Sequence, residues 1–213
     1  MTLLSFVLAG LGLVAGALAI AADARGRRTA VYVSRPAAIV FLMLAALLKS
    51  PAAAPPPYRV FILAGLAASL AGDVFMILPR KRFAAGLAAF LCAQLCYGYA
   101  FWKFPVHLVS SAILLPFLVF ALLVFRAVAP AAGRLKLPVL VYVAAITGMA
   151  WQAADRFVYL GGAAALAAFA GALLFLASDA ALAWNRFVRP IGRAQLIILG
   201  TYIPAQALIA LSV

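Results

Sequence analysis

Two aspartates lie inside long apolar runs, and they are the side chains best suited to chemistry. Asp73 falls in residues 63–83, LAGLAASLAGDVFMILPRKRF, and Asp179 falls in residues 171–187, GALLFLASDAALAWNRF. Arg80 follows Asp73 by seven positions, and Arg186 follows Asp179 by the same seven. A carboxylate inside an apolar span is costly and usually functional. We therefore take the pair as the candidate catalytic centre.

General acid and base chemistry requires one neutral carboxylic acid and one ionised carboxylate. Gly65, Ser69 and Asp73 share one helix face, and small residues on it let another helix approach, so Asp73 should point into the bundle. We expect no Lys or Arg at the depth of the two acids, so burial favours the neutral form. Two close carboxyls also share a proton. The alternative is a structural aspartate that only bonds a neighbouring hydroxyl.

The composition indicates a polytopic membrane protein. The 213 residues are 69% hydrophobic, with a mean hydropathy of +1.19, whereas a soluble domain is about 45–50% apolar. The formal net charge is +13, but the basic residues sit in short turns between apolar runs. This pattern fits membrane orientation and argues against nucleic-acid binding, which needs basic patches interleaved with exposed aromatics.

The apolar runs predict an all-α bundle of eight transmembrane helices in one domain, residues 1–213. Pro36 is expected to open the second helix, and Asp155-Arg156 is expected to be a turn. The first run is long enough to be a retained span. Helices three and seven carry the acids, which suggests parallel repeat halves, 1–104 and 105–213. The expected spans are residues 3–22, 36–48, 60–78, 83–101, 105–129, 137–154, 159–184 and 193–213.

Basic residues alternate between the two ends of the predicted bundle. The first, third, fifth and seventh turns carry 13 of the 17 Lys and Arg residues. The positive-inside rule places these turns in the cytoplasm and both termini outside, and we expect a bacterial inner-membrane location. At about 1.5 Å per residue, each acid lies roughly 10 Å below the cation that follows it.

Other polar side chains inside the spans are candidates for substrate binding, although each alone is more typical of an interhelical hydrogen bond. Tyr202 and Gln206 share one helix face. Cys92 and Cys96 lack the ligand cluster of a metal site, and His107 falls near the outer surface. We predict no metal and no organic cofactor. The candidates are Gln94, Tyr97, Tyr142, Ser178, Tyr202 and Gln206, with Arg80 and Arg186 as phosphate-binding cations.

Residues 71–101, AGDVFMILPRKRFAAGLAAFLCAQLCYGYAF, resemble the YhhN-like lysoplasmalogenases, which are integral membrane hydrolases. Gly72-Asp73 is one motif of the resemblance, and Ser178-Asp179 with Arg186-Phe187 resembles the second acidic motif. The family often has His where Gln94 stands, so that position can hydrogen-bond here but cannot titrate. Further matching positions are Phe83, Gly86, Phe90, Tyr97, Phe101, Pro138 to Tyr142, Tyr202 and Gln206, while Arg35-Pro36 stands where Lys-Pro is commoner.

The resemblance implies hydrolysis of the vinyl ether of a lysoplasmalogen to a fatty aldehyde and a glycerophospho-head-group alcohol. Acid opens a vinyl ether by protonating the carbon beta to oxygen, and two carboxyls would serve the oxocarbenium-like state as they do in glycosidases. The lysophospholipid would enter from the membrane lipids with its phosphate near the cytoplasmic cations. No oligomeric state is predicted.

Two other functions fit the same acids. A small proton-coupled transporter would use the aspartates as a relay, and a lipid-binding protein would use them without turnover. Mid-span Pro or Gly breaks in the acid-bearing helices would favour a transporter, and neither of these helices contains an internal Pro.

The charge asymmetry generates a topology prediction. Reporter fusions in the Arg134 turn and after Val213 should report opposite sides of the membrane, with the Arg134 turn in the cytoplasm. A fusion in the Arg186 to Arg193 turn is the control, because it should match Arg134. Arg134 and Val213 reporting from the same side would refute the orientation.

Overall fold

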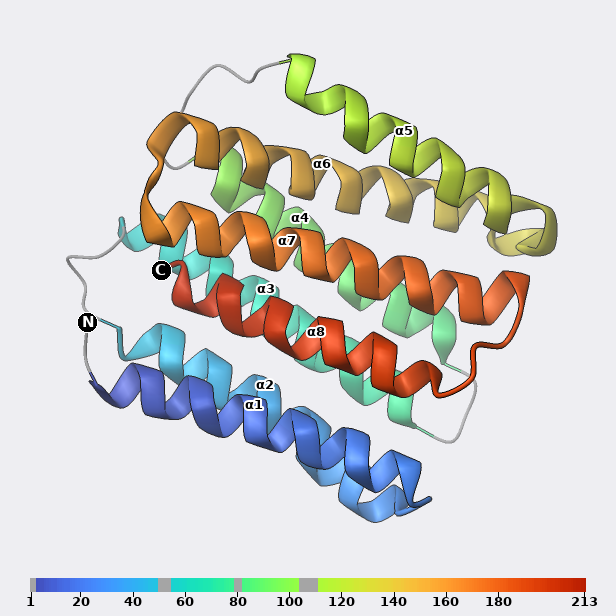
Figure 1. The fold of residues 1–213 in the computed structure, drawn as a ribbon, viewed down its shortest axis with the longest axis horizontal. Coiled ribbons are helices and arrows are strands. Elements are labelled where there is room, and N and C mark those ends of the chain that lie inside the picture. The colour runs from blue at the N-terminus through green and yellow to red at the C-terminus, as the bar shows by residue number, and fades with distance from the viewer. Residues whose placement is uncertain (1–2, 50–54, 79–81, 104–110) are drawn as a thin grey trace.

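The computed structural model describes residues 3–49, 55–78, 82–103 and 111–213, and within them the chain is a bundle of eight long helices without strands (Figure 1). Each helix is long and apolar enough to cross a membrane, which confirms the predicted all-α membrane bundle. The helices are α1 (Leu3–Ala24), α2 (Arg28–Leu47), α3 (Pro56–Ile77), α4 (Phe83–Lys103), α5 (Ser111–Val128), α6 (Lys136–Leu160), α7 (Gly162–Ala183) and α8 (Ala194–Leu211).

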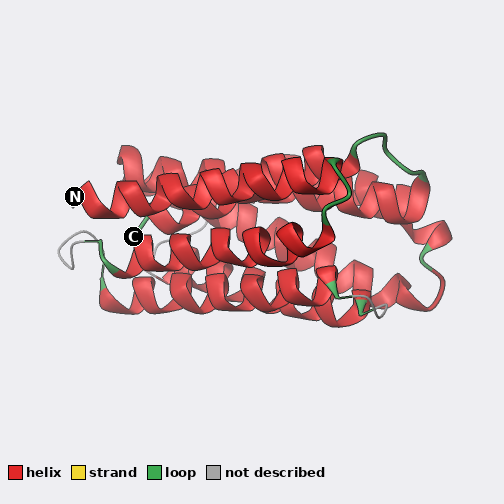
Figure 2. Ribbon diagram, turned by 90° about the horizontal axis from the view of Figure 1, so that it is seen from below, coloured by secondary structure: helices red, strands yellow, loops and turns green. Residues whose placement is uncertain are grey.

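The helices run back and forth along one direction, with both chain ends at the same end of the bundle (Figure 1). Figure 2 shows the same arrangement from below, with the loops gathered at the two ends. Sequence neighbours form the closest pairs, α1 with α2, α3 with α4 and α7 with α8. Helix α8 also packs against α1, α2 and α3, whereas α5 lies at the edge against α6. The last helix therefore joins the two ends of the chain into one bundle.

Small residues allow the closest helix contacts, as lipid-embedded bundles require. A Cβ on Gly65 of α3 would lie 2.2 Å from the Tyr97 ring of α4. A Cβ on Gly171 of α7 would lie 2.8 Å from the Ala205 carbonyl oxygen of α8. These glycines set the separation of the helices that carry the two aspartates from their neighbours.

The predicted start of the second helix was wrong. Helix α2 begins at Arg28, and Pro36 lies inside it, because neighbouring helices in a membrane bundle compensate for the hydrogen bond that a proline removes. Arg35 is consequently a helix residue seven positions from the start of α2, and its side chain is buried.

The predicted turn at Asp155-Arg156 was also wrong. Helix α6 continues to Leu160 and ends where Gly161 and Gly162 adopt φ of +63° and +76°, a region that favours glycine. Asp155 and Arg156 are both buried. The Arg156 guanidinium lies 4.4 Å from the centroid of the Tyr58 ring, and this cation–π contact helps the helix keep the charge inside the bundle.

The two aspartates occupy equivalent places in their helices. Asp73 lies four residues before the end of α3, and Asp179 lies four residues before the end of α7. After Ala183 the chain continues as a short π-helical segment, Trp184–Val188. The equal placement agrees with the expected equal depth, while the repeat halves, the orientation and the inner-membrane location stay predictions.

Candidate active site

Asp73 is held by a cation and a hydroxyl from two other helices. The Arg35 Nε atom donates to Asp73 Oδ1 at 2.7 Å, and Arg35 Nη2 lies 2.7 Å from the same oxygen. The Tyr202 hydroxyl of α8 donates to Asp73 Oδ2 at 2.9 Å. Asp73 is fully buried, so the ion pair is screened little by solvent. One carboxylate thus ties α2, α3 and α8 together.

This ion pair corrects the expectation that no cation lies at the depth of the acids. Arg35 stands seven residues into α2, about 10 Å from its start, which matches the depth expected for Asp73. Arg35 was expected in a turn because the second helix was expected to begin at Pro36. An i, i+7 spacing between Arg28 and Arg35 was the available signal, since it equals the spacing from Asp73 to Arg80.

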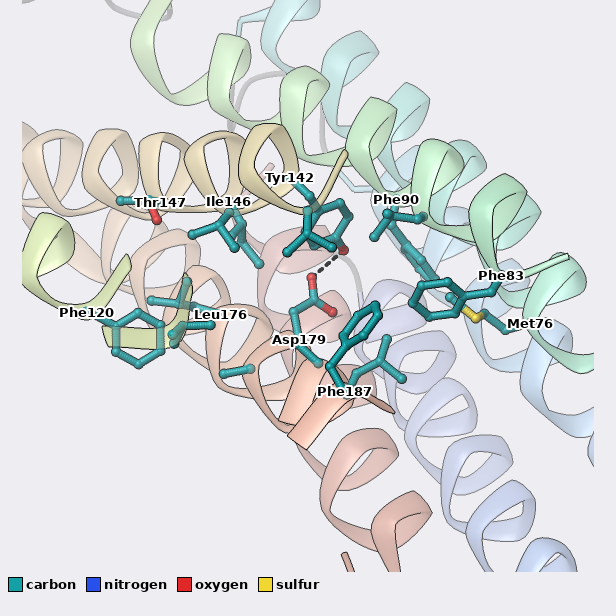
Figure 3. Close-up of a pocket in the computed structure, with 17 residues that line it drawn as sticks. Met76, Phe83, Phe90, Phe120, Tyr142, Ile146, Thr147, Leu176, Asp179 and Phe187 are labelled. Atoms are coloured by element: carbon teal, nitrogen blue, oxygen red, sulfur yellow. Dashed lines mark hydrogen bonds between the residues drawn. The ribbon is translucent and has the colours of Figure 1, made fainter. Parts of the chain in front are cut away.

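Asp179 has neutral hydrogen-bond donors instead. The Tyr142 hydroxyl of α6 donates to Asp179 Oδ2 at 2.5 Å, as Figure 3 shows. The Gln94 Nε2 of α4 donates to the same oxygen at 3.0 Å. Both donors therefore converge on Oδ2 and leave Oδ1 as the oxygen available for a proton. Gln94 Oε1 is buried and has no hydrogen-bond partner, so it can accept one from a water or a substrate.

Asp179 lines a narrow apolar pocket, called here the acid pocket (Figure 3). The pocket has a volume of about 40 Å³, enough for only a few water molecules. The Phe83 and Phe187 rings meet edge to face, with their centroids 5.9 Å apart, on one side of it. Its residues come from α3 to α7 and the segment after α7, and include Met76, Phe90, Phe120, Tyr142, Ile146, Thr147, Leu176 and Phe187.

A layer of aromatic rings connects the two acid sites. The Tyr202 ring, whose hydroxyl holds Asp73, packs 5.7 Å from Phe90 and 5.6 Å from Phe175 between centroids. Phe90 also lines the acid pocket, whereas Asp73 is not among its lining residues. Asp73 is therefore linked to the pocket through Tyr202 and Phe90.

The remaining predicted residues are placed as follows. Tyr97 donates to Gln206 Oε1 at 2.7 Å, and Gln206 Nε2 donates to Ser69 at 3.0 Å, so these buried groups join α4, α8 and α3. Ser178 donates to the Ile198 carbonyl at 2.9 Å and joins α7 to α8. None of these hydrogen bonds goes to either aspartate.

Of the two cations predicted to bind phosphate, Arg186 belongs to the described residues. Arg186 is exposed, and its guanidinium lies 5.1 Å from the Phe83 ring beside the acid pocket. Arg80 and His107 fall outside the described residues. In the part of the chain that the structure describes, no group of three or more His, Cys, Asp or Glu is placed to hold a metal ion.

Comparison with known proteins identifies the family. The model of the YhhN family matches residues 30–213. The chain belongs to this family. The match includes both aspartates and the four side chains that hydrogen-bond to them, Arg35, Gln94, Tyr142 and Tyr202. No solved structure matches the chain.

Several curated relatives carry a functional name. Lysoplasmalogenase TMEM86B from Sus scrofa is 35% identical over 158 residues, which cover 73% of this chain and 64% of that protein. Human lysoplasmalogenase TMEM86A is 36% identical over 166 residues, covering 74% and 66%. The uncharacterized membrane protein YhhN of Escherichia coli O157:H7 is 31% identical over 172 residues, covering 76% of each. The chain thus spans about 64% of the length of the first of these relatives.

The buried ion pair generates a stability prediction. Arg35→Met leaves Asp73 buried without its cation, and breaking a buried pair in this way costs about 3–5 kcal/mol. We expect a clear fall in the apparent unfolding temperature of the purified protein in detergent. Adding Asp73→Asn removes the orphaned charge and should recover much of the loss.

Arg25→Met is the control, because Arg25 is an exposed basic residue in the turn before α2. It should leave the unfolding temperature unchanged. An Arg35→Met protein as stable as the wild type, or a double variant less stable than Arg35→Met, would contradict a stabilising pair.

Proposed function

We propose that this protein is a membrane lysoplasmalogenase, which hydrolyses the vinyl ether of a lysoplasmalogen to a fatty aldehyde and a glycerophospho-head-group alcohol. The observation that carries the proposal is Asp179, a carboxyl in an apolar pocket with two neutral donors on one oxygen. The names of the curated relatives support the same reaction.

On this proposal, Asp179 is the general acid. Its partners Tyr142 and Gln94 carry no charge, and an apolar surrounding favours the neutral form of a carboxyl. Both donors bind Oδ2, so Oδ2 is the carbonyl oxygen when the carboxyl is protonated. The proton then lies on Oδ1. This is the arrangement of an acid that can release a proton into the pocket.

Asp73 is the second carboxylate and stays ionised. Arg35 supplies a positive charge at 2.7 Å, and Tyr202 adds a hydrogen bond. A fixed negative charge in a region of low dielectric stabilises a nearby cation more strongly than it would in water. Asp73 would therefore stabilise the cationic intermediate by its charge, and it neither donates nor accepts a proton in the reaction.

The reaction follows from these two states. Asp179 donates its proton to the alkenyl carbon beta to the ether oxygen, and the double-bond electrons form the new C–H bond. The resulting oxocarbenium ion lies beside the newly formed Asp179 carboxylate. Water then adds to the carbon bonded to oxygen and returns a proton to Asp179. The hemiacetal collapses with transfer of its hydroxyl proton to the departing alcohol oxygen.

The acid pocket accounts for the substrate class. Its wall is almost wholly apolar and suits a hydrocarbon chain, and Tyr142, Thr147 and Asp179 are its polar lining residues. The pocket is narrow, so a bound chain must displace side chains. Two of the lining side chains, Phe120 and Val124, belong to α5, the helix at the edge of the bundle. Helices α3 and α7 pass through their aspartates without a break, unlike the interrupted helices of many carriers.

The assignment of the two acids generates a prediction on turnover. Asp179→Asn keeps size and hydrogen-bonding capacity but cannot transfer a proton, and loss of a general acid costs about 10²–10⁴-fold. We expect turnover to fall at least 100-fold, and Asp73→Asn to lower it by a smaller factor. The measurement is fatty aldehyde formed per enzyme from a lysoplasmalogen in detergent.

Asp155→Asn is the matched control. Asp155 is a buried aspartate near the end of α6, whereas Tyr142, the partner of Asp179, is near its start, so this substitution should leave turnover unchanged. Gel filtration establishes that each variant is folded. A folded Asp179→Asn protein with near-normal turnover would exclude Asp179 as the acid, and absence of aldehyde from the wild type would exclude the function.

Protonation at carbon generates an isotope prediction. In D₂O the proton that Asp179 delivers is a deuteron, so the aldehyde should carry one deuterium on the carbon next to its carbonyl. Mass spectrometry of the product, trapped at once by reduction to the alcohol, measures this. The control is the unlabelled aldehyde incubated with the enzyme in D₂O, and product without deuterium would rule out protonation at carbon.

A further inference from the structure

A second pocket, called here the polar pocket, is lined by residues of α1, α2, α3 and α8 and of the turn between α1 and α2. These helix ends lie at the end of the bundle away from the termini (Figure 1). Its volume is about 410 Å³, within the range of about 300–1,000 Å³ typical of small-molecule sites. Its lining includes Asp23, Arg28, Tyr32, Arg35 and Gln195. None of its lining residues is among the site residues predicted from the sequence, although Arg28 and Arg35 belong to the cytoplasmic cations near which the phosphate was expected.

The charges of the polar pocket are of both signs. Arg28 and Arg35 bring positive charge, and Asp23 brings a negative charge. Arg35 is ion-paired with Asp73, so Arg28 and Asp23 are the charged side chains of the pocket that lie outside this ion pair. A ligand with one negative and one positive group matches this arrangement better than an anion alone.

The polar pocket is a neighbour of the acid pocket. Met76, in the last turn of α3, lines both of them. A flexible methionine between two pockets can adapt to a ligand that passes it. A single amphiphilic molecule can therefore place its chain beside Asp179 and its polar end beside Arg28.

Resting on the proposed function, we propose that the polar pocket binds the zwitterionic head group of the lysophospholipid and selects substrates that carry an ammonium. Arg28 binds the phosphate. Asp23 and the ring of Tyr32 receive the ammonium, the first by charge and the second by a cation–π contact. Head groups with phosphate alone leave Asp23 unpaired beside an anion and bind more weakly.

The polar pocket and Arg186 are alternative places for the head group. Arg186, the cation predicted from the sequence, lies over the Phe83 ring, and it does not line the polar pocket. The polar pocket instead offers both charges within one cavity. Phosphate specificity and ammonium specificity thus come from different residues, Arg28 and Asp23, and can be separated by substitution.

Binding of uncleavable ligands tests the proposal. The protein in nanodiscs is titrated with an alkyl-ether lysophosphocholine and with the same alkyl glycerophosphate lacking choline. We expect the wild type to bind the phosphocholine about ten-fold more tightly, the scale of one charge-assisted interaction. Asp23→Asn should abolish that preference. Arg28→Gln should weaken binding of both ligands about ten-fold.

Arg25→Gln is the matched control, because it makes the same change of charge in the same turn and Arg25 does not line the pocket. It should leave both affinities unchanged. A preference that survives Asp23→Asn, or equal weakening by Arg25→Gln and Arg28→Gln, overturns the proposal. So does loss of binding in Arg186→Gln alone, which would put the head group beside Phe83. These ligands cannot be hydrolysed, so the result is independent of whether the protein releases aldehyde.

Discussion

The ion pair between Arg35 and Asp73 is the constraint on which the rest of the bundle depends. Either charge alone inside a membrane bundle carries a penalty of several kcal/mol, so α2 and α3 must meet with these two side chains in register. Tyr202 adds α8 to the same carboxylate, and α8 packs on α1, α2 and α3. The polar contact thereby specifies which helices are neighbours, a selection that apolar surfaces facing lipid make poorly.

The fold gives its two matching aspartates opposite surroundings. Asp73 has a guanidinium and a hydroxyl, whereas Asp179 has a hydroxyl and an amide beside an apolar wall. Equal position in the helix does not make the groups equivalent, because the partner on the facing helix differs. General acid and base chemistry uses one neutral carboxyl and one ionised carboxylate, and unequal surroundings favour this division.

The sequence was sufficient for the number of helices and the burial of the acids, because hydropathy and small-residue spacing act locally along one helix. It was also sufficient to single out Gln94, Tyr142 and Tyr202 as polar candidates. It failed at Arg35 and at Asp155-Arg156, where rules for isolated helices were applied to Pro36 and to buried charges. In both places a partner on another helix, Asp73 or Tyr58, makes the unusual residue stable. Pairing of Asp179 with α4 and α6 also depends on tertiary packing alone.

The substrate of the proposed reaction changes from apolar to polar at the bond that reacts. In a lysoplasmalogen the vinyl ether is the junction of hydrocarbon chain and glycerol, so it must lie where an apolar cavity gives way to a polar one. Met76 marks that boundary, because it lines both the acid pocket and the polar pocket. Asp179 lies on the apolar side and Arg35 on the polar side, with Asp73 paired to Arg35. Binding of the two ends would therefore position the reacting carbon without a contact to the carbon itself, and orientation of this kind lowers the barrier that the acid has to overcome.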